Sequence, residues 1–332
     1  MRKVKIIAEI GPNHNGKIYL AKRLIKEAKK SGADYVKFQT FITEDIIIKS
    51  AKKAKYQIDK KHINETQFSM LKKLQFSQSD FKIIYRYCKK IGIKFLSTAF
   101  DIKSLKFINS LKPDYLKIPS GEITNLQLIK EITKFKRKII LSTGMSNLKE
   151  VDTIFKFIKK NGISKNKIII LHCNTEYPTP MEDVNLNVLK TFSKKFKVEV
   201  GYSDHTMGID VPIAAVAMGA KVIEKHFTLN RKMRGPDHKA SLEPKEFKEM
   251  VNSIKRIEKA LGVFTKKPTN SEKKNIIIAR KSIIAARKIK KGEKFTIKNL
   301  CIKRPGNGLS PMYWYKILGK ISKKNYLKDD LI

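Results

Sequence analysis

Two histidines occupy matching positions near the ends of two consecutive apolar runs. His205 follows the run Val198–Tyr202, and His226 stands near the end of the run Val222–Phe227, with a small-residue helix between them. A strand–helix–strand reading places both imidazoles at the same ends of neighbouring parallel strands. Glu224 lies two residues before His226 and therefore points to the same face of its strand. Two imidazoles with a nearby carboxylate suit a divalent metal ion, for which we favour His205 and His226 as ligands.

The elements that must position these residues recur along the chain. Apolar, β-branched runs alternate with patterned helical segments, of which the last is 244–261. The eight runs are Val4–Ile10, Tyr35–Thr40, Phe95–Phe100, Tyr115–Pro119, Ile139–Thr143, Ile168–Cys173, Val198–Tyr202 and Val222–Phe227. Strands that alternate with helices indicate a parallel sheet, and eight units in about 260 residues favour a (β/α)8 barrel. A doubly wound open sheet is the alternative, but residues 11–16 after the first run, GPNHNG, do not match the GxGxxG turn usual there.

Polar side chains stand at the C-terminal end of all eight runs, where catalytic residues of such barrels collect. They are Glu9, Asn13, His14, Lys37, Gln39, Ser97, Thr98, Asp101, Lys117, Ser120, Glu122, Ser142, Thr143, His172, Asn174, Glu176, Tyr177, Ser203, Asp204, His205, Glu224, Lys225 and His226. One such residue means little, but eight occupied ends predict a site.

The mixture of side chains indicates an anionic substrate. Buried lysines are costly unless they meet an anion, so Lys37 and Lys117 are expected to bind phosphate or carboxylate, helped by hydroxyl donors. A metal-polarised carbonyl beside them fits a carbon–carbon bond-forming enzyme or an aldolase. Two alternatives remain open: either lysine could form a Schiff base, or pair structurally with Glu9 or Glu122.

The remaining histidines have simpler interpretations. His172, within an apolar run, is expected to be a hydrogen-bonded core residue, and His14 to cap a turn. His62 lies in a lysine-rich loop and is expected to be exposed. His238, in GPDHKAS, lies near the predicted site but is equally well interpreted as a loop stabiliser.

Two segments fall outside the repeat. Residues 41–78, between the second and third runs, form a long connection with a candidate helix over 65–74, which could act as a lid. The repeat stops at about residue 262. We therefore expect a catalytic barrel over 1–262, a linker over 263–280 and a small second domain over 281–332, which is near the lower size for independent folding.

Composition limits the class of protein. The net charge of +42 would suit a nucleic-acid binder, but the lysines are spread evenly without interleaved aromatic residues. We therefore attribute the charge to a lysine-rich proteome and expect no nucleic-acid partner. No apolar run could span a membrane, and the start lacks a signal-peptide pattern. Three distant cysteines form no disulfide framework. These features predict a cytoplasmic protein.

Motifs along the whole chain resemble the sialic acid synthase family, which makes N-acetylneuraminate and related nonulosonates. They are AEIGPNHNG (8–16), GADYVKFQTF (32–41), STAFD (97–101), KIPSGE (117–122), LSTGMS (141–146), LHCNTEYPTP (171–180), GYSDHT (201–206), EKHFTL (224–229), GPDHKASLEP (235–244) and KRPGNGLSP (303–311). The resemblance implies a TIM barrel followed by an antifreeze-like SAF domain, which in the family reaches over the barrel of the other subunit in a domain-swapped homodimer.

The resemblance also implies roles for individual residues. His205 and His226 would bind Mn2+ or Mg2+, Glu9 would be the acid/base group, and Glu122 and Glu224 would lie near the metal and sugar. Residues expected to hold phosphoenolpyruvate are Lys37, Thr98, Lys117, Ser120, Ser142, Asn174 and Ser203. Those expected to hold the sugar are Gln39, Tyr177, Asp237 and, from the partner subunit, Arg304.

The implied reaction condenses phosphoenolpyruvate with an N-acylated mannosamine-type aldose and water, and releases phosphate. The leading expectation is an N-acetylneuraminate synthase that uses N-acetylmannosamine. The alternative is an N,N'-diacetyllegionaminate synthase, which uses 2,4-diacetamido-2,4,6-trideoxymannose. The GPDHKASLEP motif makes a pseudaminate synthase less favoured, and a basic nucleic-acid-binding protein is the distant alternative.

Overall fold

The computed structural model describes residues 3–54, 57 and 65–332. The chain divides into two compact units, Met1–Gly262 and Val263–Ile332. Within the described residues, no helix has the length and apolar character needed to cross a membrane.

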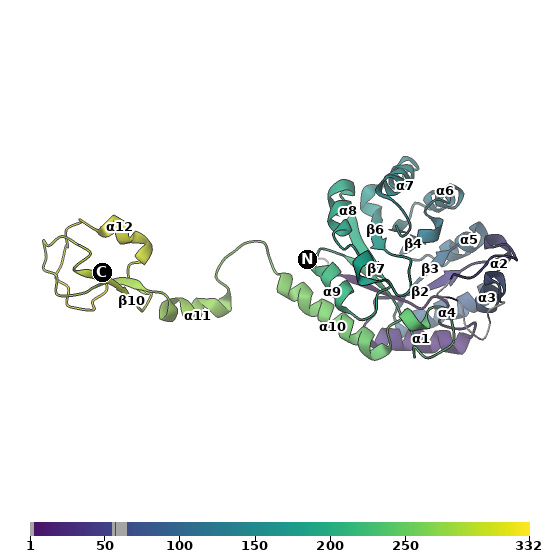
Figure 1. Ribbon diagram of the computed structural model, residues 1–332, viewed down its shortest axis with the longest axis horizontal. Helices are drawn as coiled ribbons and strands as arrows, with labels where there is room; N and C mark the ends of the chain where they lie inside the picture. The colour runs from purple at the N-terminus through teal and green to yellow at the C-terminus, as the bar shows by residue number, and fades with distance from the viewer. Residues whose placement is uncertain (1–2, 55–56, 58–64) are drawn as a thin grey trace. The chain divides into compact units, whose positions relative to one another are not determined.

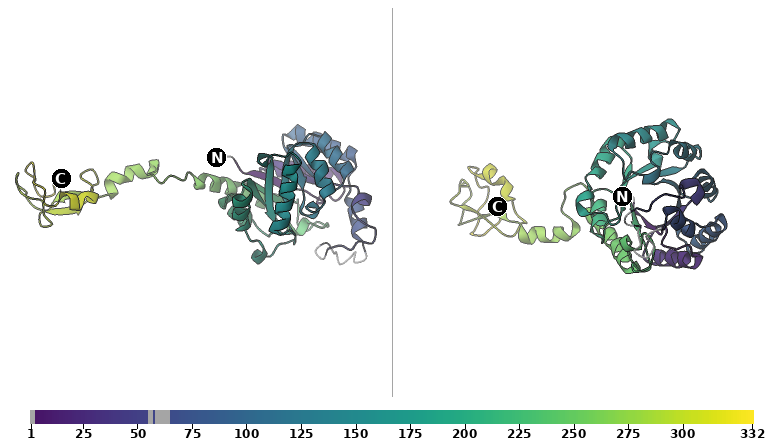
Figure 2. Two further views of the ribbon diagram at one scale, coloured as in Figure 1. Left: turned by 90° about the horizontal axis from the view of Figure 1, so that it is seen from above. Right: turned by 45° about the vertical axis from the view of Figure 1, so that its right-hand side comes forward.

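The first unit is a closed barrel of eight parallel strands in sequence order, ringed by helices (Figure 1; Figure 2). This confirms the (β/α)8 prediction over the doubly wound alternative. The strands are β1 Lys5–Glu9, β2 Tyr35–Thr40, β3 Lys94–Ala99, β4 Tyr115–Ile118, β5 Lys138–Ser142, β6 Ile168–Cys173, β7 Glu199–Asp204 and β8 Val222–His226.

The strand register brings the C-terminal ends together. β1 closes the barrel because it pairs with both β2 and β8, so that Glu9 lies opposite Lys37 on one side and His226 on the other. Further round the ring, Thr98 of β3 lies opposite Lys117 of β4. Residues far apart in sequence therefore share one end of the barrel.

The helices cover the outside of the barrel with apolar faces. In α7, the buried residues Val151, Ile154, Phe155 and Ile158 follow the helical spacing of three and four, and Asn147 caps the first turn. The principal helices of the unit are α1 Ile18–Lys30, α4 Gln78–Ile91, α5 Ile102–Ser110, α6 Leu126–Lys134, α7 Leu148–Lys160, α8 Val188–Phe196, α9 Asp210–Ala217 and α10 Pro244–Leu261.

A plug of apolar side chains fills the barrel interior below the strand ends. It consists of Ile7, Tyr35, Leu96, Tyr115, Ile140, Ile169, Leu171 and Val222. Because these inward-facing residues are packed, the interior is a core rather than a pore. The plug separates the polar side chains at the C-terminal ends of the strands from those at the opposite end, where Lys5 pairs with Glu199.

The long connection between β2 and β3 carries two helices, α2 Thr43–Ile46 and α3 Gln67–Leu74. The predicted helix over 65–74 is thus present, starting two residues later. Gln75 fixes the end of α3. Its side-chain oxygen accepts a hydrogen bond from the backbone N–H of Thr43 at 2.9 Å and another from the Thr43 hydroxyl at 2.8 Å. His62 lies outside the described residues.

The second unit has its own small core. Antiparallel β9 Ser282–Ala285 and β10 Leu300–Lys303 pack with α12 Trp314–Ile317 around Ile283, Ala285, Ile289, Phe295 and Leu300. The segment 263–280 differs from an irregular linker because it contains α11 Asn270–Ala279. A capping box between Thr269 and Glu272 starts this helix. The polar composition of the segment had indicated a linker instead.

Candidate active site

Four charged side chains lie buried together above the apolar plug. Lys37 Nζ is 2.7 Å from Glu9 Oε2 and 3.5 Å from Glu224 Oε1, and Lys117 Nζ is 3.6 Å from the same Glu224 oxygen. Each of the four is at most 4% exposed. Two lysines and two carboxylates thus balance one another.

Three hydroxyls surround this charge cluster. Lys117 donates to Ser142 Oγ at 2.7 Å, and Lys37 donates to Thr98 Oγ1 at 3.3 Å. Ser203 donates to Glu224 Oε1 at 3.2 Å. Ammonium and hydroxyl donors aimed at one small space are the groups that bind phosphate and carboxylate oxygens.

Burial and neighbouring charges oppose each other here. Burial lowers the pKa of Lys117, and although Glu224 counteracts this, the pKa stays below its ordinary value. Burial alone would raise the pKa of Glu224, but Lys117 and Lys37 together hold that pKa below its ordinary value. The second oxygen of Glu224, Oε2, has no hydrogen-bond partner among the described residues. A small ligand or water could satisfy it.

The two histidines stand beside this cluster, with ring centroids 5.3 Å apart. His205 Nδ1 bonds to the Asn174 carbonyl oxygen at 2.5 Å, which fixes the ring and leaves Nε2 for another contact. Burial lowers the pKa of His205 to about 4, and burial followed by the charge of His205 lowers the pKa of His226 well below its ordinary value. Both rings are therefore neutral near pH 7, the form that ligates metals.

These residues fit a divalent cation with an open coordination sphere. His226 Nδ1 is buried and without a hydrogen-bond partner among the residues described, and the carbonyl contact of His205 is the usual outer contact of a ligating histidine. No group of three or more His, Cys, Asp or Glu side chains arranged for a metal occurs in residues 3–54, 57 and 65–332. Two protein ligands would leave positions for substrate and water, as in catalytic sites.

Three residues predicted to bind the sugar lie on the rim next to the histidines. The Tyr177 ring stacks on His205 with centroids 4.0 Å apart, and Asp237 Oδ2 is 3.5 Å from His226 Nδ1. Gln39 donates to Glu9 Oε1 at 3.1 Å. Burial and then the charge of Glu9 raise the pKa of Asp237 to about 7, so it can donate or accept a hydrogen bond near neutral pH.

Three predicted site residues make their described contacts elsewhere. Glu122 accepts a hydrogen bond from Asn125 in its own loop at 2.7 Å. The Ser120 hydroxyl lies 3.2 Å from the Cys173 sulfur, at the edge of the site. Arg304 belongs to the second unit, where its Nε donates to the Ala279 carbonyl at 3.1 Å.

Three other histidines have structural contacts, which were expected for His172 and His14 and were one of two interpretations of His238. His172 Nε2 bonds to the Val184 carbonyl oxygen at 2.8 Å. His14 Nδ1 accepts from the Gly16 amide at 3.0 Å and its ring stacks on Phe76, with centroids 4.0 Å apart. His238 Nδ1 bonds to a threonine hydroxyl at 2.6 Å, which anchors the loop that carries Asp237.

Sequence reasoning gave no role to a buried ion pair just behind the histidines. Lys225 Nζ lies 2.5 Å from Asp204 Oδ2 and 2.5 Å from the Thr206 carbonyl oxygen, and both charged side chains are 0% exposed. Each directly precedes a histidine, so it points to the opposite face of its strand. The sequence feature that could have predicted this ion pair is the presence of opposite charges at matching positions of consecutive strands.

Comparisons with known proteins agree with this geometry. Residues 24–266 match the model of the NeuB family, and residues 280–332 match the SAF domain. The chain is 51% identical to the N,N'-diacetyllegionaminic acid synthase of Campylobacter jejuni, covering 100% of this chain and 99% of that protein. It is 34% identical to the N-acetylneuraminate-9-phosphate synthase of Homo sapiens, covering 98% and 90%.

A solved structure gives the same assignment. The N-acetylneuraminic acid synthetase of Leptospira borgpetersenii, crystallised with citrate, superposes with a TM-score of 0.73 at 34% identity, covering 83% of this chain and 90% of that one. The fold and the site therefore define a barrel synthase of the sialic acid type. The chain belongs to the NeuB family and carries a C-terminal SAF domain.

Proposed function

We propose that this enzyme condenses phosphoenolpyruvate with 2,4-diacetamido-2,4,6-trideoxymannose and water to give N,N'-diacetyllegionaminate and phosphate. The observation that carries the condensation is the pair of buried lysines beside two neutral histidines in one barrel mouth. The first group suits an anionic donor and the second suits an aldehyde acceptor. N-acetylneuraminate synthesis from N-acetylmannosamine was the leading expectation from sequence, and it becomes the second candidate.

Similarity to named relatives supports this order of the two sugars. The relative named for legionaminic acid is 51% identical over 100% of this chain, whereas the human relative named for N-acetylneuraminate 9-phosphate is 34% identical over 98% of this chain. The catalytic residues are compatible with either aldose, since both expose the same aldehyde at C1. The preference therefore has to arise from contacts with the remainder of the sugar.

The lysines would bind the anionic donor. Lys37 and Lys117, with Thr98, Ser142 and Ser203, would hold the carboxylate and phosphate of phosphoenolpyruvate. Their ammonium groups now interact with Glu9 and Glu224, so binding replaces one set of charge contacts with another and avoids an uncompensated buried charge. The same donors would stabilise negative charge on the departing phosphate.

His205 and His226 would hold Mn2+ or Mg2+, which when bound supplies Lewis-acid polarisation of the aldehyde. The methylene carbon C3 of phosphoenolpyruvate forms the new bond to C1 of the aldose with the electrons of its C2–C3 double bond, so C2 becomes cationic. The two protons of the water that adds next end on the former aldehyde oxygen, which becomes a hydroxyl, and on the phosphate. Water then adds at C2 of the donor, and Glu9 is placed to accept its proton. Cleavage of the C2–O bond releases phosphate and leaves the 2-keto acid.

The SAF domain would complete the site from a second subunit. Arg304 lies in the unit Val263–Ile332 and its side chain is exposed. A guanidinium binds carboxylate and hydroxyl oxygens through several donors at once. We therefore propose a domain-swapped homodimer in which Arg304 of one copy contacts the sugar in the other.

Phosphate release tests the proposal directly. The purified protein is incubated with phosphoenolpyruvate, Mn2+ or Mg2+, and either 2,4-diacetamido-2,4,6-trideoxymannose or N-acetylmannosamine. We expect phosphate and a nine-carbon 2-keto acid in equal amounts, faster with the trideoxy sugar. Faster turnover of N-acetylmannosamine would select the second candidate, and no turnover of either sugar would refute the proposed function.

A further inference from the structure

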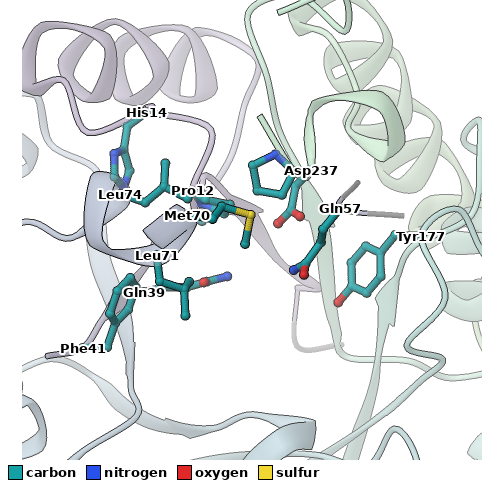
Figure 3. Close-up of a pocket in the computed structure, with 12 residues that line it drawn as sticks. Pro12, His14, Gln39, Phe41, Gln57, Met70, Leu71, Leu74, Tyr177 and Asp237 are labelled. Atoms are coloured by element: carbon teal, nitrogen blue, oxygen red, sulfur yellow. The ribbon is translucent and has the colours of Figure 1, made fainter. Parts of the chain in front are cut away.

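A cavity at the barrel mouth has two chemically different sides. Its polar side includes Tyr177 and Asp237, beside the histidines. Its other side carries three apolar side chains of α3, and the amides of Gln39 and Gln57 also line the cavity. We call the side chains Met70, Leu71 and Leu74 the α3 wall. Figure 3 shows Asp237 and Tyr177 on one side of this space and Leu74 on the other.

The cavity gives a bound aldose a direction. Tyr177 stacks on His205, and Asp237 lies 3.5 Å from His226, so the polar side adjoins the place where the aldehyde C1 must lie. A six-carbon sugar that starts there extends across the cavity. The end remote from C1, which carries C6, then meets the α3 wall.

The wall is held in place by its surroundings. Met70 and Leu74 are each 8% exposed, and Leu71 is partly exposed toward the cavity. Thr66 caps the start of α3 by accepting a hydrogen bond from an amide at 3.2 Å, and Gln75 ties its end to the chain after β2. A surface fixed at both ends can discriminate between ligands without first having to be ordered.

The chemistry of this wall favours a methyl group. The two leucine side chains have no hydrogen-bonding atom, and the Met70 thioether is only a weak acceptor. A hydroxymethyl group pressed against them loses water without gaining a partner, whereas a methyl group gains apolar contact. Resting on the condensation proposed above, we propose that Met70, Leu71 and Leu74 form the subsite for C6 and select a 6-deoxy sugar.

Two aldoses that differ only at C6 isolate this contact. They are N-acetylmannosamine and its 6-deoxy form, and kcat/KM is measured for each with phosphoenolpyruvate and Mn2+. An apolar pocket discriminates against an added hydroxyl by up to roughly a hundredfold. We expect the wild-type enzyme to favour the 6-deoxy sugar by roughly 10- to 100-fold.

Substitutions then assign the preference to the wall. Leu71→Gln should bring the ratio close to one, mainly by improving the use of the hydroxylated sugar, because the amide can bond to the hydroxyl. Leu71→Met should keep the ratio. The matched control is Lys72→Ala, an exposed neighbour on the same helix that pairs with Glu44 at the surface; it should keep both the rates and the ratio.

The outcomes separate this inference from the proposed function. Turnover of both sugars with a wild-type ratio near one, or a Leu71→Gln variant that slows both sugars equally, would overturn the subsite while leaving the condensation intact. Absence of phosphate release with either of them and with the diacetamido sugar would overturn the condensation itself. Thermal unfolding of each variant identifies any general loss of structure.

Discussion

Replacement of Lys225 by methionine should destabilise the barrel strongly. Lys225 and Asp204 are both 0% exposed, and Lys225 Nζ contacts Asp204 Oδ2 and the Thr206 carbonyl oxygen, each at 2.5 Å. Methionine retains most of the length of the side chain but removes the charged end. Asp204 keeps the hydrogen bonds that Thr206 donates at 3.0 and 2.8 Å, yet its carboxylate loses the cation.

The expected cost follows from that uncompensated charge. Removing one partner of a buried ion pair costs about 3–5 kcal/mol of unfolding free energy. For a unit of this size, such a loss lowers Tm by roughly 6–20 °C. In the double variant with Asp204→Asn, no net charge remains buried, so part of the stability returns. The cycle of the two single variants and the double should give a coupling of about 2 kcal/mol.

The assay can separate the two units of the chain. Far-UV circular dichroism during denaturant unfolding follows mainly the barrel. The chain has one tryptophan, Trp314 in the second unit, so its fluorescence serves as an internal control. We expect the dichroism transition of Lys225→Met to shift and the Trp314 transition to stay. The reasoning would be refuted by an unchanged dichroism transition. It would also be refuted if the loss of unfolding free energy in the double variant equalled the sum of the losses in the two single variants.

Other predictions concern pH, packing, metal and assembly. Burial lowers the pKa of His14 to about 3, so as pH falls below 6.5 the unfolded state binds a proton at His14 that the folded state does not. The free energy of unfolding should therefore fall by about 2 kcal/mol at pH 5. His14→Asn should remove that part of the acid sensitivity in unfolding curves. Gly201→Ala should cost about 1–3 kcal/mol because a Cβ would lie 2.4 Å from a β8 backbone oxygen, whereas Gly121→Ala, in open space, should be near neutral in the same measurement. Chelation should abolish phosphate release and added Mn2+ or Mg2+ should restore it; normal turnover after chelation would exclude the metal role. Mixing the inactive variants Arg304→Ala and His226→Ala should restore activity if the SAF domain works across subunits, and failure to complement would argue for a site built within one chain.

The sequence contained enough to predict the barrel and much of its mouth. Apolar, β-branched runs followed by polar residues mark strand ends, and eight such runs leave few alternatives. That pattern placed Lys37, Lys117, His205 and His226 at one end of the barrel, where the structure has them. The reason is local: a strand's alternation determines which side chain faces inward, and parallel pairing then aligns the ends.

Features that depend on long-range packing could not be predicted in the same way. The α3 wall comes from a connection whose sequence gives no indication of which barrel residues it will face. Glu122 stays a predicted neighbour of the sugar, and its hydrogen bond from Asn125, in its own loop, could not be anticipated from the strand pattern. The Lys225–Asp204 pair depends on the exact register of β7 and β8, which places the two residues opposite each other, and the prediction of neighbouring strands did not include that register.

Closure of the barrel by β1 and β8 has a consequence for synthesis. Lys5 pairs with Val222, more than two hundred residues later in the sequence. During synthesis, β1 therefore cannot pair with β8 until the last strand of the ring has left the ribosome. At about 5–20 residues per second, that wait is roughly 10–40 s. Throughout it, β1 exposes an unpaired apolar edge, which invites association between nascent chains. This strand order therefore makes ring closure a late step, during which protection by chaperones has most effect.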